Sequence, residues 1–294
     1  MRPPHASDHP RDILRERGLV ARRRLGQSFL VSPTIMARVV EACQIGAGDV
    51  VLEIGTGLGH LTEHLAERAA AVVSVEIDRG FCDVARDRLA GHAHVTLLCA
   101  DFLASKHRIN PVVTDTVRKV AAGRPVKVAS NLPYQISSAA IVNLLEWEVP
   151  VNEIAVMLQA EVADRLRARP GTAQYGPLTV FAVYRAEVEE LFTVPASAFW
   201  PRPAVHSAFV RLVPRPPACV ARSYETFSEA VNRLFQCRRK TLARALHVGW
   251  KDLDAGRLLA SLSLDPVRRP ETLSLEEFVS IANALAESSS QRSR

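Results

Sequence analysis

Short apolar runs alternate with helix-forming segments between residues 34 and 158, and this alternation constrains the fold more than any other feature of the chain. The run at 50–54 has the length of a buried strand, and a glycine-rich turn at 55–59 and a helical segment at 60–68 follow it. Further strand-like runs follow at 72–77, 95–99, 126–130 and 154–158. Strands that alternate with helices in this way predict an α/β fold with a parallel, doubly wound sheet.

The pattern changes in the second half of the chain. Segments 178–184, 188–194 and 207–213 have the character of strands and predict an antiparallel edge of the sheet. After the proline cluster at 214–217 the pattern is helical, at 224–235, 239–246, 253–262 and 275–285. Ser274 and Glu277 have the spacing of a capping box at the start of the last helix.

We therefore expect two folded domains between two disordered ends. The proline cluster predicts a boundary between a Rossmann-like sheet domain at 13–214 and a small all-helical domain at 218–287. Residues 1–12 and 288–294 have the polar composition of disordered ends. Within the sheet domain, the valine spacing at 102–124 is compatible with a helix.

Composition narrows the class of protein. The 294 residues are 48% hydrophobic, which suffices for a large core and a smaller second one, and a net charge of +6 favours a polyanionic partner. Five cysteines without a CxxC pair and nine histidines without metal-ligand spacing predict reduced cysteines and no structural metal. Because the sequence contains no apolar stretch of membrane-spanning length and no signal peptide, we expect a cytoplasmic protein.

Four residues, Asn131-Leu132-Pro133-Tyr134, directly follow the apolar run at 126–130. Open α/β sheets bind their ligands at the carboxyl ends of the strands. A primary amide oxygen can accept a hydrogen bond from an exocyclic amine, a proline holds a fixed bend, and a tyrosine offers a flat face to a base. The four residues are therefore suited to chemistry on an adenine amino group. The alternative is a turn in which Asn131 only caps the next helix.

The glycine turn predicts a second part of the site. Gly55, Gly57 and Gly59 let the backbone approach a ligand, but their spacing is not the G-x-G-x-x-G of dinucleotide enzymes. Glu76, at the end of the run at 72–77, can bind both ribose hydroxyls of a nucleoside-type cofactor. Asp101, just after the run at 95–99, can accept a hydrogen bond from an adenine amino group. Each acid alone could instead be a solvated residue at the end of a strand.

Successive motifs between Arg23 and about Leu285 resemble those of the ribosomal RNA adenine dimethyltransferases, which use S-adenosylmethionine. In chain order they are Leu25–Leu30, Glu53–Gly59, Val75–Asp78, Asn131–Ser137, Met157–Val162, Tyr175–Leu178 and Phe199–Pro203. The segment from Phe235 to Leu242 resembles the small-subunit branch, which modifies two adjacent adenines in a hairpin loop near the 3′ end of the small-subunit RNA. The resemblance implies a Rossmann-like methyltransferase sheet with a C-terminal helical domain that binds RNA.

The resemblance also implies roles for individual residues. Ser28 and Leu30 would cover the cofactor, Gly55 would contact its methionine part, Glu76 its ribose and Asp101 its adenine. Gly57 and Asn131 would also belong to the cofactor site. Asn131 and the Leu132 carbonyl, held by the bend at Pro133, would align the target amine with the methyl group on sulfur. Tyr134 and Phe199 would enclose the flipped adenine, although each aromatic residue could instead belong to the core.

The chain departs from the family pattern at Ser28, where the family usually has Asn, and at Ala204 and His206, where it usually has Lys and Asp. The last two changes remove one expected phosphate contact and one carboxylate from that loop, and they leave the transfer chemistry intact.

Basic clusters predict contacts with RNA phosphates, although arginines on helices are more often part of a solvated face. The clusters are Arg22-Arg23-Arg24, Arg165/Arg167/Arg169 and Arg238-Arg239-Lys240. Together with the resemblance, they imply small-subunit RNA within a pre-30S particle as the partner. No long heptad pattern is present, so we expect a monomer.

Two alternatives stay open at this point. One is the related large-subunit enzyme, a 23S ribosomal RNA adenine dimethyltransferase that confers macrolide resistance. Its motif commonly has Ile where this chain has Leu132, and its C-terminal segment differs. The other is a non-catalytic assembly or transcription factor with the same fold. A protein that only binds RNA need not retain Glu76, Asp101 and Asn131.

Overall fold

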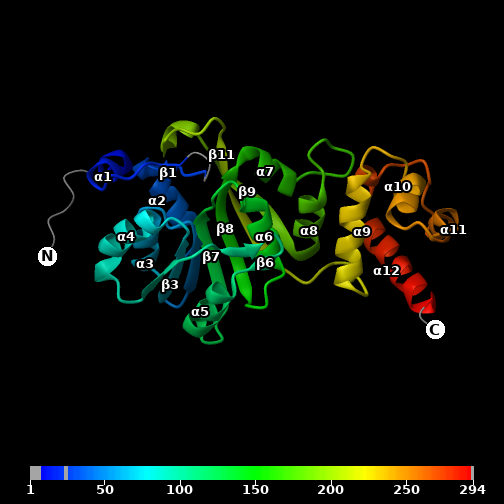
Figure 1. Ribbon diagram of the computed structural model, residues 1–294, viewed down its shortest axis with the longest axis horizontal. Helices are drawn as coiled ribbons and strands as arrows, with labels where there is room; N and C mark the ends of the chain where they lie inside the picture. The colour runs from blue at the N-terminus through cyan, green and yellow to red at the C-terminus, as the bar shows by residue number, and fades with distance from the viewer. Residues whose placement is uncertain (1–7, 23–25, 293–294) are drawn as a thin grey trace. The chain divides into compact units, whose positions relative to one another are not determined.

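The computed structural model describes residues 8–22 and 26–292 and divides into two compact units (Figure 1). The sheet unit comprises residues up to 163 together with 188–214, and the helical unit comprises 164–187 together with the residues after 214. One junction therefore lies at the proline cluster, whereas 164–187 group with the C-terminal helices. The functional domain division expected from the sequence stays a prediction.

A seven-stranded sheet with the order β4-β3-β2-β7-β8-β11-β9 forms the centre of the sheet unit. Its strands are β2 (Val50–Ile54), β3 (Ala71–Glu76), β4 (Val95–Cys99), β7 (Val126–Asn131), β8 (Val151–Gln159), β9 (Ala186–Val194) and β11 (Ser207–Pro214). Strands β4, β3, β2, β7 and β8 are parallel, and β11 pairs antiparallel with β8. The predicted α/β class is confirmed.

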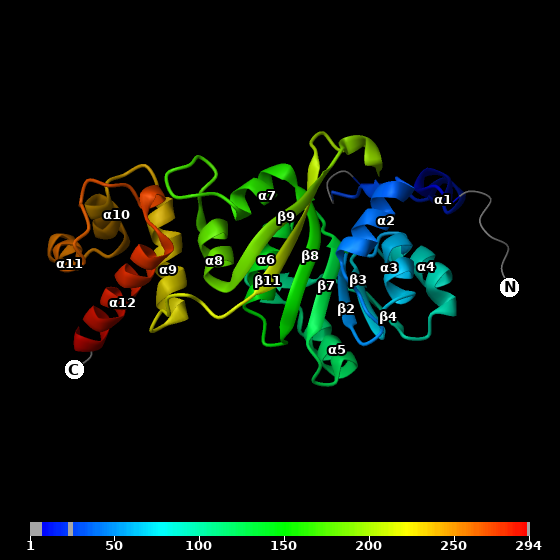
Figure 2. The ribbon, with the colours of Figure 1, turned by 180° about the vertical axis from the view of Figure 1, so that it is seen from behind.

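The strand order reverses between β2 and β7, which lie side by side in Figure 2. The chain builds β2, β3 and β4 outward on one side and then crosses back to place β7 and β8 on the other. Every residue of β2 is buried, as expected for a central parallel strand covered on both faces. At such a reversal the connections leave in opposite directions and open a crevice at the carboxyl ends of the strands.

Helices connect and cover the strands. They are α2 (Pro33–Ala42), α3 (His60–Ala66), α4 (Arg79–Arg88), α5 (Pro111–Ala121), α6 (Ser137–Leu145) and α7 (Ala160–Leu166), and α5 packs against β2 and β3 and α6 against β8. Local chemistry sets their starts: the Asp78 carboxylate accepts hydrogen bonds from the first turn of α4, and Asn110 caps α5. In the segment 102–124, whose valine spacing is compatible with a helix, a hairpin of β5 (Leu103–Ser105) and β6 (Arg108–Ile109) precedes α5.

The N-terminal segment belongs to the sheet unit. Helix α1 (Pro10–Glu16) lies partly in the region expected to be disordered, and it buries Ile13 and Leu14 against Leu58, Phe81 and their neighbours. Strand β1 (Phe29–Leu30) pairs antiparallel with β10 (Phe199–Trp200). Short 3-10 turns occur at Leu89–Gly91, Ala196–Ala198 and Pro270–Thr272. The apolar partners of α1 come from distant parts of the chain, so its composition alone did not predict it.

The helical unit contains α8 (Pro177–Arg185), α9 (Tyr224–Gln236), α10 (Leu242–Gly249), α11 (Ala255–Ser261) and α12 (Leu275–Arg292). The strand predicted at 178–184 is wrong, because Pro177 starts a helix whose Phe181 and Tyr184 pack on Phe227 of α9. The capping box at Ser274 and Glu277 is confirmed, and α12 continues to Arg292 through most of the segment expected to be disordered. None of the helices in the described ranges is long and apolar enough to cross a membrane.

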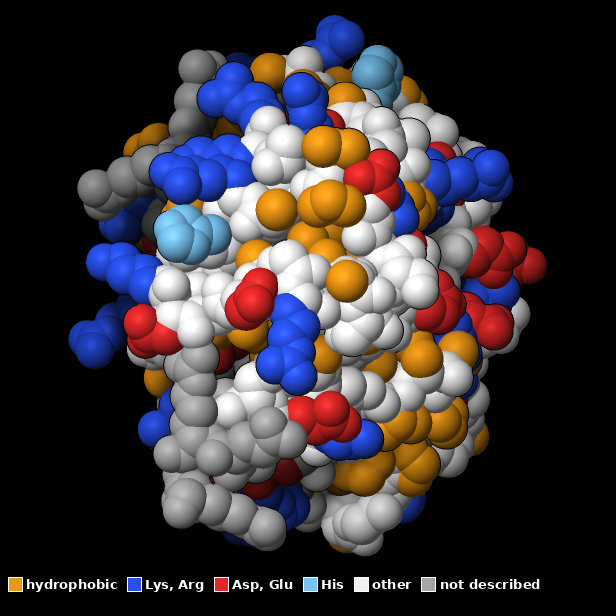
Figure 3. All heavy atoms as spheres, turned by 90° about the vertical axis from the view of Figure 1, so that its right-hand side faces the viewer, with side chains coloured by type: hydrophobic (Ala, Val, Ile, Leu, Met, Phe, Trp, Pro, Cys, Tyr) orange, Lys and Arg blue, Asp and Glu red, His pale blue; other side chains and the backbone are white. Residues whose placement is uncertain are grey.

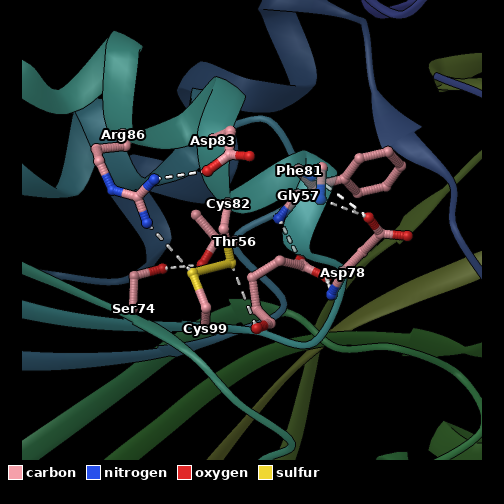
Figure 4. The surroundings of a disulfide bond; sticks show 11 residues. Thr56, Gly57, Ser74, Asp78, Phe81, Cys82, Asp83, Arg86 and Cys99 are labelled. Carbon is pink, nitrogen blue, oxygen red and sulfur yellow. Dashed lines mark hydrogen bonds and ion pairs between the residues drawn. A yellow bond between two sulfur atoms is a disulfide. The ribbon is translucent and has the colours of Figure 1, made fainter. Parts of the chain in front are cut away.

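Cys82 of α4 and Cys99 at the end of β4 form a disulfide, so the prediction that the cysteines are reduced is wrong for this pair (Figure 4). Their spacing of 17 residues does not reveal that α4 lies over β4, where the two Cα atoms are 6.0 Å apart. Cys99 is solvent-exposed, and the Arg86 guanidinium lies 3.6 Å from its sulfur. Cys43, Cys219 and Cys237 are free thiols.

We predict that alkylation of the denatured chain without reductant modifies only Cys43, Cys219 and Cys237, and that reduction exposes two further sites. Mass spectrometry counts the labels. Because the disulfide closes a loop of 17 residues, Cys99→Ser should lower the free energy of unfolding by about 3 kcal/mol relative to the control Cys219→Ser. Labelling of all five cysteines without reductant would contradict the disulfide.

Candidate active site

A pocket of about 330 Å³ opens at the carboxyl ends of β2, β3 and β7, where the strand order reverses. Ten of the residues that line it were predicted from the sequence. The predicted residues that line it are Ser28, Leu30, Gly55, Gly57, Glu76, Asp101, Asn131, Leu132, Pro133 and Tyr134. The structure therefore brings the predicted cofactor residues and the Asn-Leu-Pro-Tyr segment into one cavity.

The glycine turn and Glu76 form one wall. The backbone N–H of Gly57 donates to Oε2 of Glu76 at 2.8 Å, and the N–H of Asp78 donates to Oε1 at 2.9 Å. Each carboxylate oxygen keeps acceptor capacity for a hydroxyl group, because a carboxylate offers about four lone-pair sites. Burial raises the pKa of Glu76, and the backbone hydrogen bonds oppose this shift. Figure 4 shows this turn beside the start of α4.

Gly55 joins the turn to the Asn-Leu-Pro-Tyr segment. Its φ of 89° lies in the left-handed region, and a Cβ atom at this position would lie 2.9 Å from Cγ of Pro133. Any larger residue would push the two walls of the pocket apart. The requirement for glycine is therefore steric as well as conformational.

A buried polar network lies beneath the turn and was not predicted as part of the site. Thr62 and Ser74 both donate to Oε2 of Glu53, at 2.5 and 2.6 Å, and the hydroxyl of Thr56 lies 2.5 Å from that of Ser74. Burial raises the pKa of Glu53 to about 8; the nearby Glu76 adds to this shift, and the hydrogen bonds from Ser74 and Thr62 oppose it. Glu53 also lines the pocket. The sequence did contain a signal for this network, because Glu53 places a carboxyl group within an otherwise apolar run.

Asp101 and Ile77 extend the pocket along the ends of β3 and β4. Oδ1 of Asp101 accepts the N–H of Leu103 at 3.0 Å, and its backbone carbonyl accepts the Asn110 side chain at 2.9 Å. Ile77 lines the same pocket, and the residue is 51% exposed. An exposed branched apolar side chain between two acids offers a surface for a flat ring. Ile77 was missed because it looked like the last residue of a strand.

The amide of Asn131 has a fixed orientation. Its Nδ2 donates to the backbone carbonyl of Ser28 at 3.1 Å, and within the described ranges no donor to its Oδ1 is recorded. The oxygen is thus the amide atom left for a ligand. The neighbouring Ser130 hydroxyl donates to the carbonyl of Ile54 at 2.5 Å and ties β7 to β2.

Tyr134 lines the pocket, and its hydroxyl lies 2.8 Å from that of Ser207. Burial raises the pKa of Tyr134, so the phenol is neutral at physiological pH. Phe199, its predicted counterpart, does not line the pocket: it is 3% exposed and packs with Leu30 and Met36 in the core. Stacking of Phe199 on a base would require the side chain to leave this core, and its role stays a prediction.

The predicted RNA-binding arginines have different surroundings. Arg22 lies 3.8 Å from Asp78, and Arg23 and Arg24 lie outside the described residues. Arg238 is used within the helical unit: Nε donates to Glu271 at 2.5 Å and Nη2 to the carbonyls of Thr172 and Ala173. The sequence could not reveal these partners, because they are more than thirty residues away.

Arg239 and Lys240 are exposed and border a hollow of about 690 Å³ in the helical unit, together with Arg269. They precede α10, which starts only at Leu242 because Thr241 caps it. Among the described residues no ion pair is recorded for these three cations, so their charge is free to attract an anion. Figure 3 shows the face with the C-terminal helices, where Lys and Arg side chains are interspersed with acidic ones. The described ranges contain no cluster of His, Cys, Asp and Glu suited to a metal ion.

The chain is similar to known proteins over almost its entire length. A family model described as ribosomal RNA adenine dimethylase matches residues 18–287. Proteins named ribosomal RNA small subunit methyltransferase A from Bacillus mycoides (strain KBAB4) and Bacillus cereus (strain AH187) are each 40% identical over 281 residues, which is 94% of both chains.

Solved structures with the same fold include a dimethyladenosine transferase from Plasmodium falciparum, with a TM-score of 0.72, 23% identity and coverage of 90% of this chain and 98% of that one. The 23S rRNA methyltransferase ErmE has a TM-score of 0.61 and 26% identity, with coverage of 88% and 99%.

We predict that Glu53→Gln changes the pH dependence of stability. The folded chain keeps the Glu53 proton up to about pH 8, whereas the unfolded chain loses it near 4.5, so this group lowers the free energy of unfolding as pH rises between these values. The variant should be stabilised relative to the native protein by an amount that grows to a few kcal/mol at pH 8. Thermal unfolding from pH 4.5 to 8 measures this difference. A constant difference across the range, or an equal trend in the exposed control Glu67→Gln, would contradict the assignment.

Proposed function

Because the chain belongs to the ribosomal RNA adenine dimethylase family, we propose that it transfers methyl groups from S-adenosylmethionine to N6 of two adjacent adenines near the 3′ end of small-subunit ribosomal RNA. The observation that carries the proposal is the pocket at the strand reversal, which unites the Asn131 amide with Glu76 and Asp101. The 40% identity to small-subunit enzymes supports this branch of the family.

The residues present fit a nucleoside-type methyl donor. Glu76 has acceptor capacity for two ribose hydroxyls, Asp101 can accept from an adenine amino group, and Ile77 can cover an adenine face. The close contact of Gly55 with Pro133 brings the turn beside Asn131. S-adenosylmethionine supplies an activated methyl group on a sulfonium, and the protein supplies orientation and exclusion of water.

The Asn-Leu-Pro-Tyr segment prepares the target amine for attack. The Oδ1 atom of Asn131 and the backbone carbonyl of Leu132 each accept a hydrogen bond from the N6 amino group. These bonds draw the nitrogen lone pair out of conjugation with the adenine ring. The ring of Tyr134 supports one face of a base that has left its stack. An amide is not basic, so Asn131 does not take up the proton that N6 loses after the transfer.

The two alternatives are less well supported. The structural likeness to ErmE follows from common family membership, whereas the relatives at 40% identity carry the small-subunit name. For a non-catalytic factor, the fixed Asn131 amide and the two acids would have no use. We further propose a monomeric cytoplasmic enzyme that acts on a pre-30S particle and needs no metal.

Contact with RNA phosphates is assigned to Arg239, Lys240 and Arg269. These three cations border one hollow and form no ion pair with another described residue, which suits contact with a phosphodiester backbone. Arg238 has a different role, since its guanidinium is occupied by Glu271 and by the carbonyls of Thr172 and Ala173. Arg238 stabilises the wall of the hollow, and Arg239, Lys240 and Arg269 contact the RNA phosphates.

We predict that Asn131→Ala lowers methyl transfer by at least about 100-fold and leaves donor affinity largely unchanged, since one transition-state hydrogen bond is removed. Transfer from radiolabelled donor to unmethylated small subunits measures the rate, and calorimetry with S-adenosylhomocysteine measures binding. Asn143→Ala, whose side chain bonds the carbonyls of Lys106 and Ala139, is the control. Labelling of large subunits alone would favour the 23S alternative, and no labelling of either particle would favour the non-catalytic factor.

We predict that Arg239→Gln and Lys240→Gln each weaken binding to pre-30S particles and each reduce the salt slope of binding by about 1. The exposed Arg257, which does not border the hollow, provides the control variant Arg257→Gln. Arg238→Gln should instead lower the melting temperature, because Glu271 loses its ion pair. Equal effects of Arg239→Gln and Arg257→Gln on the salt slope would refute the assignment.

A further inference from the structure

The loop at 201–206 is anchored at both ends to residues that line the pocket, Ser28 and Tyr134. Before the loop, the hydroxyl of Ser28 donates to the carbonyl of Pro201 at 2.8 Å. After it, the hydroxyl of Ser207 lies 2.8 Å from that of Tyr134. The strand pair β1 and β10 supports the first anchor, and the pairing of Ser207 with Gln159 in β11 and β8 supports the second.

Ser28 connects this loop to the amide of Asn131. The carbonyl of Ser28 accepts a hydrogen bond from Nδ2 of Asn131, while its hydroxyl is directed to Pro201. The position of the Ser28 backbone therefore sets the direction in which Oδ1 of Asn131 points. The family resemblance implied that Ser28 covers the cofactor, but in this geometry its hydroxyl proton is used by the protein.

Ser207 fixes the position of the Tyr134 side chain through a hydrogen bond between the two hydroxyls. Its side chain is completely buried, so its hydroxyl has no water to exchange for the phenol. The bond between the two hydroxyls fixes the hydroxyl end of the Tyr134 ring, and Tyr134 is one of the residues that line the pocket. Residues that hold a reactive group must themselves be locked by packing and hydrogen bonds, because small displacements reduce rates strongly.

We propose that Ser28 and Ser207 are positioning residues for methyl transfer: Ser28 aims the Asn131 amide, Ser207 holds the Tyr134 ring, and the loop at 201–206 is their common support. The inference rests on the proposed function. It also gives the loop a role that does not depend on its own side chains. Ala204 and His206, where the family usually has Lys and Asp, are exposed and lie between the two anchors.

The first test separates positioning by Ser28 from cofactor binding. We expect Ser28→Ala to lower kcat about 10-fold, the loss for one hydrogen bond, with KM for the donor and affinity for S-adenosylhomocysteine within about twofold of native. Ser28→Thr keeps the hydroxyl and should restore most of kcat. A donor KM that rises in step with the loss of kcat, or no rescue by threonine, would overturn the role of Ser28.

The second test is a double-mutant cycle between Ser207 and Tyr134. Ser207→Ala and Tyr134→Phe each remove one hydroxyl and should each lower kcat several-fold, and the double variant should be no slower than the slower single variant. Additive losses would overturn the role of Ser207. Because Ser207→Ala could unfold, melting temperatures are measured in parallel, and Ser207→Thr provides a variant that keeps the hydroxyl.

Controls distinguish failure of this inference from failure of the proposed function. The native protein and Ser280→Ala, whose hydroxyl bonds only within α12, must both methylate small subunits. If both are inactive, the proposed function is wrong. If both are active and Ser28→Ala and Ser207→Ala have native kcat, the proposed function stands and the positioning roles are wrong.

Discussion

Parallel pairing of β2 with β7 is the constraint on which the rest of the site depends. Registers such as Leu52 with Val128 place the ends of the two strands at the same level of the sheet. The glycine turn and the Asn-Leu-Pro-Tyr segment then leave these ends and meet where Gly55 packs on Pro133. The hydroxyl of Ser130, bonded to the carbonyl of Ile54, ties the two ends together. A shift of this pairing by one residue would reverse the faces of the side chains and separate the two parts of the pocket.

Two carboxyl groups of the pocket, those of Glu76 and Glu53, have different surroundings. Glu76 is stabilised as an acceptor by two backbone N–H groups, whereas Glu53, one strand away, is held by hydroxyls and kept protonated by burial. The two carboxyl groups can therefore lie under the same turn without strong mutual repulsion. Glu76 lines the pocket beside the turn, and Glu53 supports the turn from below through Ser74 and Thr62.

The strands of the parallel sheet and the polar pocket residues at their ends could be predicted from the sequence, because apolar runs define strands and residues at or just after the end of each run fall at the carboxyl edge. Asn131, Glu76 and Asp101 follow this rule. Contacts between distant segments could not be predicted in this way. The burial of Phe199, the bonds of Arg238 and the disulfide all depend on which elements pack together, and the helix α8 forms because packing on Phe227 outweighs its strand-like composition.

The pairing of β1 with β10 has a consequence for the order of events during synthesis. Phe29 and Leu30 leave the ribosome early, but their strand partners, Trp200 and Phe199, are about 170 residues further along the chain. Contacts of such long range form slowly and only after the later segment is available. The nascent chain therefore completes the covering of its pocket only after most of the protein has been translated. A truncated chain that ends before the tenth strand would have a sheet but no finished site.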